Sequence, residues 1–118
     1  MTKEISKCGA QGDVLFRRVD RVPEGYECQP RTKEPIVVAH SETGHHHTVP
    51  GVIAALYASR ADPMVSYLML DDVQALEVTH HRPYDTHEAL SLGGGAGAVW
   101  EVRRQREHTP EGWRRVED

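Results

Sequence analysis

Residues 98–107, AVWEVRRQRE, alternate between two sets of side chains, and this alternation decides the fold class. In an extended segment, successive side chains point to opposite faces. The two faces that result carry Val99, Glu101, Arg103 and Gln105 on one side and Trp100, Val102, Arg104 and Arg106 on the other. The segment is therefore predicted to be a β-strand.

The rest of the chain consists of similar short runs, separated by Gly, Pro, Asp and Ser. Residues 12–20 predict a first strand, and residues 34–49 predict a hairpin or a long bent strand. Residues 51–59 favour a strand over a helix, although their alanines suit both. The acidic pair Asp71 and Asp72 predicts a turn. Seven or eight such strands predict an all-β fold, either a small β-sandwich or a cupin-like barrel.

The chain length of 118 residues fits a single β domain over residues 1–118. Residues 1–10 and 113–118 are candidates for flexible ends. A hydrophobic fraction of 38% gives a modest core, which contacts between copies would enlarge. We therefore expect a homo-oligomer.

Composition also excludes several classes of protein. No apolar run approaches the roughly 20 residues that cross a bilayer, and the first residues lack the apolar centre of a signal peptide, so we expect no membrane partner and a cytoplasmic protein. The net charge of −4 argues against a broad nucleic-acid-binding surface. The two cysteines, Cys8 and Cys28, are too few for a disulfide framework and are expected to be reduced thiols.

Three consecutive histidines lie in residues 43–51, TGHHHTVPG. If this segment is extended, His45 and His47 point one way and His46 the other. A histidine pair with this spacing presents two imidazoles to one metal ion, and a third ligand then comes from elsewhere.

Residues 78–88, VTHHRPYDTHE, are the strongest second source of ligands. The preferred metal site is His45, His47 and His87, with His80 as a fourth ligand or as an alternate. The neighbouring candidates for carboxylate, outer-shell or acid–base roles are Glu88, Asp85 and Tyr84. An imidazole set suits a divalent ion of Zn, Ni, Fe, Co or Cu. Each histidine taken alone also fits a solvent-exposed or backbone-bonded position, and the sequence does not decide which of His80 and His81 points inward.

Two further features are weaker signals. Residues 93–97, GGGAG, lack the lysine of a phosphate-binding loop and are interpreted as a flexible turn. Arg104 and Arg106 are candidates for contact with an anion or a partner, although a solvated, salt-bridged strand is the more common arrangement.

The order of motifs resembles a family of small uncharacterised bacterial and phage-encoded proteins. The resemblance rests on QGDVLFRRVDRVPEG, VVAHSETGHHHTV, THEALSL and VWEVRRQREHTPEGWRRVED, which together cover nearly the whole chain. It implies that the family's recurrent positions are Gly44, His45, His47, His87, Arg104, Gln105, Arg106 and Glu107, and it implies no activity. The chain departs from the family pattern at HRPYDT, at GGGAGA and at His108. The histidine pair is also similar to that of cupins, but the glutamate that follows it in cupins is missing here.

Three functions follow as hypotheses. The first is a soluble metal-binding β protein whose site is structural or regulatory. The second is a metalloenzyme with an open coordination position and an unknown small-molecule substrate. The third is a phage or mobile-element assembly protein in which the histidines face solvent.

Overall fold

The computed structural model describes residues 2–39, 46–81, 86–104, 106–109 and 112–115, and for residues 81, 86–88, 106–109 and 112–115 it describes the backbone alone. Every regular element in these ranges is a β-strand, which confirms the all-β prediction. The strands are β1 (Thr2–Ile5), β2 (Cys8–Gln11), β3 (Val14–Val19), β4 (Glu27–Cys28), β5 (Ile36–Ala39), β6 (His47–Val49), β7 (Ala54–Ala58), β8 (Val65–Leu70), β9 (Leu76–His81), β10 (Thr86–Leu92), β11 (Val99–Arg104), β12 (Arg106–Thr109) and β13 (Gly112–Arg115).

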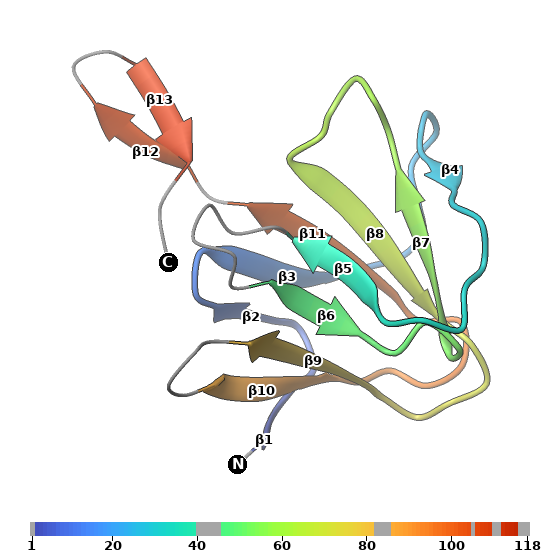
Figure 1. The fold of residues 1–118 in the computed structure, drawn as a ribbon. Coiled ribbons are helices and arrows are strands. Elements are labelled where there is room, and N and C mark those ends of the chain that lie inside the picture. Colours follow the sequence, from blue (N-terminus) through green and yellow to red (C-terminus); the bar gives the residue numbers. More distant parts are fainter. Residues whose placement is uncertain (1, 40–45, 82–85, 105, 110–111, 116–118) are drawn as a thin grey trace.

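Eleven of these strands form two sheets (Figure 1). The five-stranded sheet has the order β1-β10-β9-β6-β5, and the six-stranded sheet has the order β2-β3-β11-β8-β7-β4. Strands β12 and β13 pair separately. Neither sheet closes on itself in the described residues, so the architecture is consistent with a β-sandwich and the barrel alternative is not formed.

The sequence predicted seven or eight strands, fewer than the structure contains. The difference comes from short polar segments such as β1, β2 and β4, which lack an apolar pattern of their own. They are strands because longer neighbours pair with them: β10 pairs with β1, β3 with β2, and β7 with β4. Pairing with an existing sheet outweighs weak intrinsic propensity.

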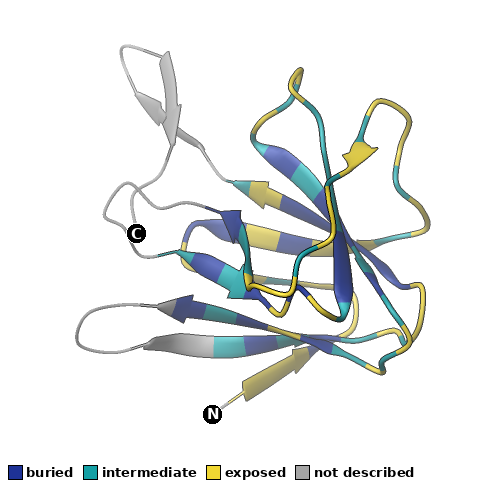
Figure 2. Ribbon diagram, turned by 45° about the vertical axis from the view of Figure 1, so that its right-hand side comes forward, coloured by how far each residue is buried: buried dark blue, intermediate teal, exposed yellow. Residues whose placement is uncertain are grey.

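Strand β11 lies at the centre of the six-stranded sheet, between β3 and β8. Trp100 and Val102 point into the core between the sheets, whereas Val99 packs on the opposite face, as the alternation predicts. The same alternation appears along β3 as dark blue and yellow segments (Figure 2). Complete burial of Trp100 and Phe16 makes this region the centre of the hydrophobic core.

Two further strand predictions are confirmed. Strands β5 and β6 pair antiparallel, so residues 34–49 contain a hairpin rather than one bent strand. Residues 54–58 form β7, so the strand prediction for residues 51–59 is correct. Asp71 and Asp72 lie in the connection between β8 and β9.

The β2–β3 hairpin turns tightly through Gly12 and Asp13, because Gln11 pairs directly with Val14. Gly12 has a φ of 59°, whereas Asp13 does not have a positive φ. This combination matches a type II′ turn, which favours glycine at its first central position. The turn fixes Gln11 and Asp13 on either side of Gly12, and both are buried.

The N-terminal strands link the two sheets. β1 pairs in parallel with β10 in the five-stranded sheet, and the chain then passes within a few residues into β2 of the six-stranded sheet. Residues 2–5 and 8–11 thus belong to strands, whereas residues 116–118 lie outside the described residues. In the described part of the chain, no helix is long and apolar enough to cross a membrane.

Candidate functional site

His47 and His80 form a stacked pair inside the sandwich. The two residues stand opposite each other in the register of β6 and β9. Their ring centroids are 3.9 Å apart, the ring planes differ by 11°, and both residues are fully buried. Burial of two imidazoles is costly unless polar partners accompany them, so the groups around this pair decide what it can do.

Gln11 fixes the proton of His47. The Gln11 Nε2 donates a hydrogen bond of 3.0 Å to the carbonyl oxygen of Val78, which can only accept. This bond orients the amide, so that Oε1 is the atom 2.9 Å from Nδ1 of His47. Because Oε1 can only accept, Nδ1 must carry the proton of this hydrogen bond.

Asp13 lies on the Nε2 side of His47. Its Oδ1 is 3.7 Å from Nε2, and the Asp13 side chain is 5% exposed. This separation exceeds that of a normal hydrogen bond, but it is short enough for strong electrostatic interaction in a buried setting. Asp13 is therefore a second polar neighbour of His47, and it comes from the same hairpin as Gln11.

The structure brings some of the predicted site residues together. His87 stands opposite His80 in the register of β10 and β9, so the backbones of His47, His80 and His87 align across three neighbouring strands. His80 is a histidine of this strand that stacks with His47. Among the side chains that the structure describes, no group of three or more His, Cys, Asp or Glu is arranged to hold a metal ion.

Other predicted residues lie beyond what the structure describes. His45, Tyr84 and Asp85 are outside the described residues, and so is Gln105. For a second set the backbone alone is described, namely His81, His87 and Glu88 near the β9–β10 connection and Arg106, Glu107 and His108 in β12. Arg104, at the end of β11, is partly exposed and does not belong to the stacked pair.

Comparison with protein families gave one match. A family model described as a domain of unknown function (DUF8820) covers residues 10–105. The chain belongs to this family. The DUF8820 match begins directly before Gln11 and includes Asp13, His47 and His80, so the whole buried polar cluster lies inside it. Neither curated proteins nor solved structures gave a significant match to the chain.

The sequence analysis missed Gln11 and Asp13 as buried polar neighbours of His47. Residues 12–20 were interpreted as a strand, but β3 begins at Val14 and Gly12 and Asp13 form the turn that follows β2. The two polar residues beside Gly12, Gln11 and Asp13, are both buried. A turn glycine flanked by one amide and one carboxylate, directly before an apolar strand, was the available signal. This signal does not indicate which histidine the two side chains contact.

A second polar centre of the DUF8820 domain lies on the outer face of the six-stranded sheet. The buried carboxylate of Glu101 accepts hydrogen bonds of 3.1 Å from Arg17, 3.2 Å from Arg103 and 3.2 Å from the hydroxyl of Tyr67. Burial opposes ionisation of Glu101, but the two guanidinium groups prevail and the pKa of its carboxyl is lowered. Burial, together with the Glu101 charge and hydrogen bond, raises the pKa of Tyr67 to about 12. Because two guanidinium groups offset the buried Glu101 charge and the Tyr67 hydroxyl donates to it, this centre is best explained as a structural network.

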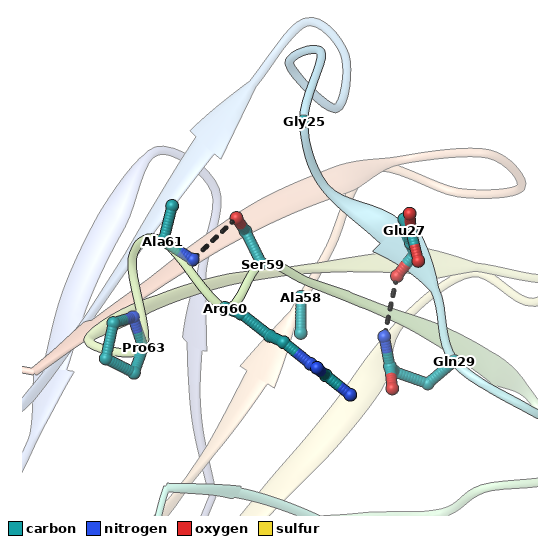
Figure 3. A pocket seen from close by; sticks show the side chains of 8 residues that line it. All are labelled: Gly25, Glu27, Gln29, Ala58, Ser59, Arg60, Ala61 and Pro63. Carbon is teal, nitrogen blue, oxygen red and sulfur yellow. Dashed lines mark hydrogen bonds between the residues drawn. The ribbon is translucent and has the colours of Figure 1, made fainter.

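An open groove lies at the far edge of the same sheet, between β4 and the β7–β8 connection (Figure 3). Its charged lining residues are Glu27 and Arg60, and the remaining lining is small or polar. The Gln29 side chain donates to the Glu27 carbonyl, and the Ala61 N–H donates to Ser59 Oγ. These bonds join groups of the lining to one another, and no histidine lines the groove. The stacked pair in the core therefore remains the stronger candidate site.

Proposed function

We propose that this protein binds a divalent transition-metal ion through histidines of β6, β9 and β10, in a site that stabilises the fold. The observation that carries the proposal is the buried His47–His80 pair, in which Gln11 holds the proton of His47 on Nδ1. Histidines that bind metals usually donate their other ring N–H to a fixed acceptor, which sets the tautomer and the ring orientation. Gln11 supplies such an acceptor, and Nε2 of His47 is the proposed ligand atom.

The remaining ligands are proposed from the sequence and the strand register. His87 stands next to His80 across β9 and β10, and His45 precedes His47 by two residues. An extended chain would direct His45 and His47 to the same side. We therefore propose a set drawn from His45, His47, His80 and His87, with Glu88, Asp85 and Tyr84 nearby in sequence.

The donor chemistry limits the metal. Cys8 and Cys28 are both exposed, whereas His47 and His80 are fully buried, so thiolates are not part of the proposed set. Imidazole nitrogens suit Zn, Ni, Fe(II), Co and Cu better than Mg or Ca. We propose Zn²⁺ or a neighbouring divalent ion of this group.

Burial favours a structural role over a catalytic one. A catalytic metal needs an open position for water or substrate, whereas a structural metal is enclosed by protein ligands. Both histidine rings have no exposed surface, and buried core residues such as Val78 and Val49 are their neighbours in sequence. The metalloenzyme alternative requires a coordination position that solvent can reach.

Metal analysis of the purified, untagged protein tests the proposal. After treatment with a chelator and separate additions of Zn²⁺, Ni²⁺, Fe²⁺, Co²⁺ and Cu²⁺, we expect at least one of these metals to bind at one ion per chain and to raise the unfolding temperature. At a free ion concentration 100 times the dissociation constant, the added stability should be about 2.7 kcal/mol. The double variant His47→Ala, His80→Ala should bind no stoichiometric metal.

His46→Ala is the matched control, because His46 is adjacent in sequence but outside the stacked pair. It should retain metal. A wild-type protein that binds none of the five metals under these conditions would overturn the proposal and would favour an assembly module whose histidines have no ligand. Exchange of bound water on the loaded metal would support the metalloenzyme alternative instead.

A further inference from the structure

We infer that the open groove between β4 and the β7–β8 connection binds a free amino acid with an aliphatic side chain. The groove is separate from the proposed metal site and shares no lining residue with it. Its volume is about 780 Å³, which lies in the range of about 300–1,000 Å³ that is typical of small-molecule sites. The polar groups of the groove, its fixed shape and an adjoining apolar hollow support the inference.

Opposite charges line the two walls of the groove. Arg60 belongs to the β7–β8 connection and Glu27 to β4, and Figure 3 shows the Arg60 side chain extending toward the wall that carries Glu27. The two side chains do not form an ion pair with each other, and neither the guanidinium nor the carboxylate bonds to another described residue. A ligand that carries both an anionic and a cationic group can therefore bind to both walls at once.

Neutral polar groups on each wall have the matching character. The Nε2 of Gln29 donates a hydrogen bond of 2.9 Å to the Glu27 carbonyl, so Oε1 of Gln29 is left as an acceptor on the same wall. On the other wall, the Ser59 hydroxyl accepts a hydrogen bond of 3.2 Å from the Ala61 N–H and keeps its own proton to donate. Acceptors for an ammonium group thus lie on the Glu27 wall, and donors for a carboxylate lie on the Arg60 wall.

The two walls are held together without a ligand. Tyr26 directly precedes Glu27 on one wall, and Asp62 directly follows Ala61 on the other. The Tyr26 hydroxyl donates a hydrogen bond of 2.9 Å to Oδ2 of Asp62. The Tyr26 ring also lies edge-to-face with the ring of Tyr67 on β8, with the centroids 4.9 Å apart. A groove whose walls are already joined has less to order when a ligand binds, which favours affinity.

A small apolar hollow adjoins the groove, and Gln29 lines both. Ile36, Ala54 and Leu56 contribute its aliphatic lining, and its volume is about 140 Å³. An aliphatic side chain placed there would be removed from water, which adds to affinity. A groove with opposite charges beside an apolar hollow matches the chemistry of an amino acid such as leucine.

An NMR titration of the wild-type protein with L-leucine tests the inference. We expect saturable shifts of the backbone amide signals of residues 25–29 and 58–62. N-acetyl-leucine lacks the ammonium group and leucinamide lacks the carboxylate, so each should bind at least about 10-fold more weakly than leucine. Glycine should also bind more weakly than leucine, because it leaves the apolar hollow empty.

Two variants test the charged groups separately. Arg60→Gln and Glu27→Gln should each weaken leucine binding by about 10-fold, because each removes the partner of one charged group of the ligand. Both residues are exposed, so both variants should unfold at the temperature of the wild type. Lys3→Gln and Glu4→Gln are the matched controls, because they remove the same charges from exposed positions of β1 in the other sheet. Their affinity for leucine should equal that of the wild type.

Three results would each overturn the amino-acid site. The first is the absence of saturable shifts in residues 25–29 and 58–62 up to the solubility limit of leucine. The second is equal binding of N-acetyl-leucine and leucine, because the groove would then recognise a carboxylate alone. The third is wild-type affinity in both Arg60→Gln and Glu27→Gln, which would place the bound leucine elsewhere on the protein. The metal site is tested by different measurements and would stand or fall independently.

Discussion

Gln11 of β2 and His47 of β6 are joined by a hydrogen bond of 2.9 Å, although the two strands belong to different sheets. The same Gln11 side chain donates to the Val78 carbonyl of β9. One amide thus connects the β2–β3 hairpin to two strands of the opposite layer. Such a bridge contributes to stability whether or not a metal is bound.

Replacement of Gln11 by alanine should destabilise the metal-free protein by about 1–3 kcal/mol, because a buried ring N–H and a buried carbonyl each lose a partner. Urea unfolding in the presence of a chelator measures this loss. Gln29→Ala is the control, since the Gln29 amide also donates to a backbone carbonyl but does so at the surface. Equal losses for the two variants would contradict the bridging role of Gln11.

Gly51→Ala should be strongly destabilising because there is no room for a Cβ atom. An added Cβ would overlap the carbonyl oxygen of Glu34 and lie 2.8 Å from that of Thr32. Backbone atoms cannot rotate away as side chains do, so we expect a loss of about 3 kcal/mol. Thermal or denaturant unfolding measures it.

The matched control is Gly93→Ala, whose Cβ would meet only the Ile5 carbonyl oxygen, at an ordinary 3.6 Å. Its stability should stay within about 0.5 kcal/mol of the wild type. A loss of stability for Gly51→Ala as small as that for Gly93→Ala would mean that residues 32–34 can move away from the added Cβ atom.

Glu101 should contribute to a loss of stability in acid. Its pKa is lowered in the folded protein, because the Arg103 and Arg17 guanidinium groups outweigh the effect of burial. A group with a lowered folded-state pKa adds stability above its unfolded value, which is near 4.5, and this stability is lost as the pH falls through the folded value. Denaturant unfolding as a function of pH should therefore show a weaker acid dependence in Glu101→Gln. Arg17→Met should shift the acid loss to higher pH, and an unchanged profile in both variants would contradict the network.

Tyr67 should make the protein sensitive to alkali. Its pKa rises from 10.0 to about 12 because the hydroxyl is buried and bonded to Glu101. A raised folded-state pKa adds stability that is complete below the unfolded value and is lost as the pH rises through the folded value. Stability should thus fall between pH 10 and about pH 12. Tyr67→Phe should remove part of this fall, as measured by unfolding at several pH values in that range.

The fold class was predictable because it depends on local patterns. Trp100 and Val102 alternate with Val99 and Glu101 in the sequence, and the structure places the two pairs on opposite faces. The strand count was less predictable, since β4 has two exposed residues and exists only through its pairing with β7. A periodic apolar pattern identifies strands that have a buried face, but it does not identify edge strands whose residues are exposed.

The candidate site was predictable only in part, because strand register is a property of the whole sheet. The sequence indicated that His47 and His80 were ligand candidates, but their contact depends on the pairing of β6 with β9. Gln11 and Asp13 reach the pair from the other sheet, and no spacing rule connects residues 11 and 13 with residue 47. The histidines in the sequence indicated metal-binding chemistry, whereas Gln11 and Asp13 approach the pair only through tertiary packing.

The outermost strands of both sheets are short. Strands β1, β2 and β5 have four residues each and β4 has two, and the ladder of β5 is interrupted by a register shift. A strand of another molecule that approached any of these edge strands would find few aligned amide and carbonyl groups to pair with. The short edge strands therefore disfavour edge-to-edge aggregation into fibres.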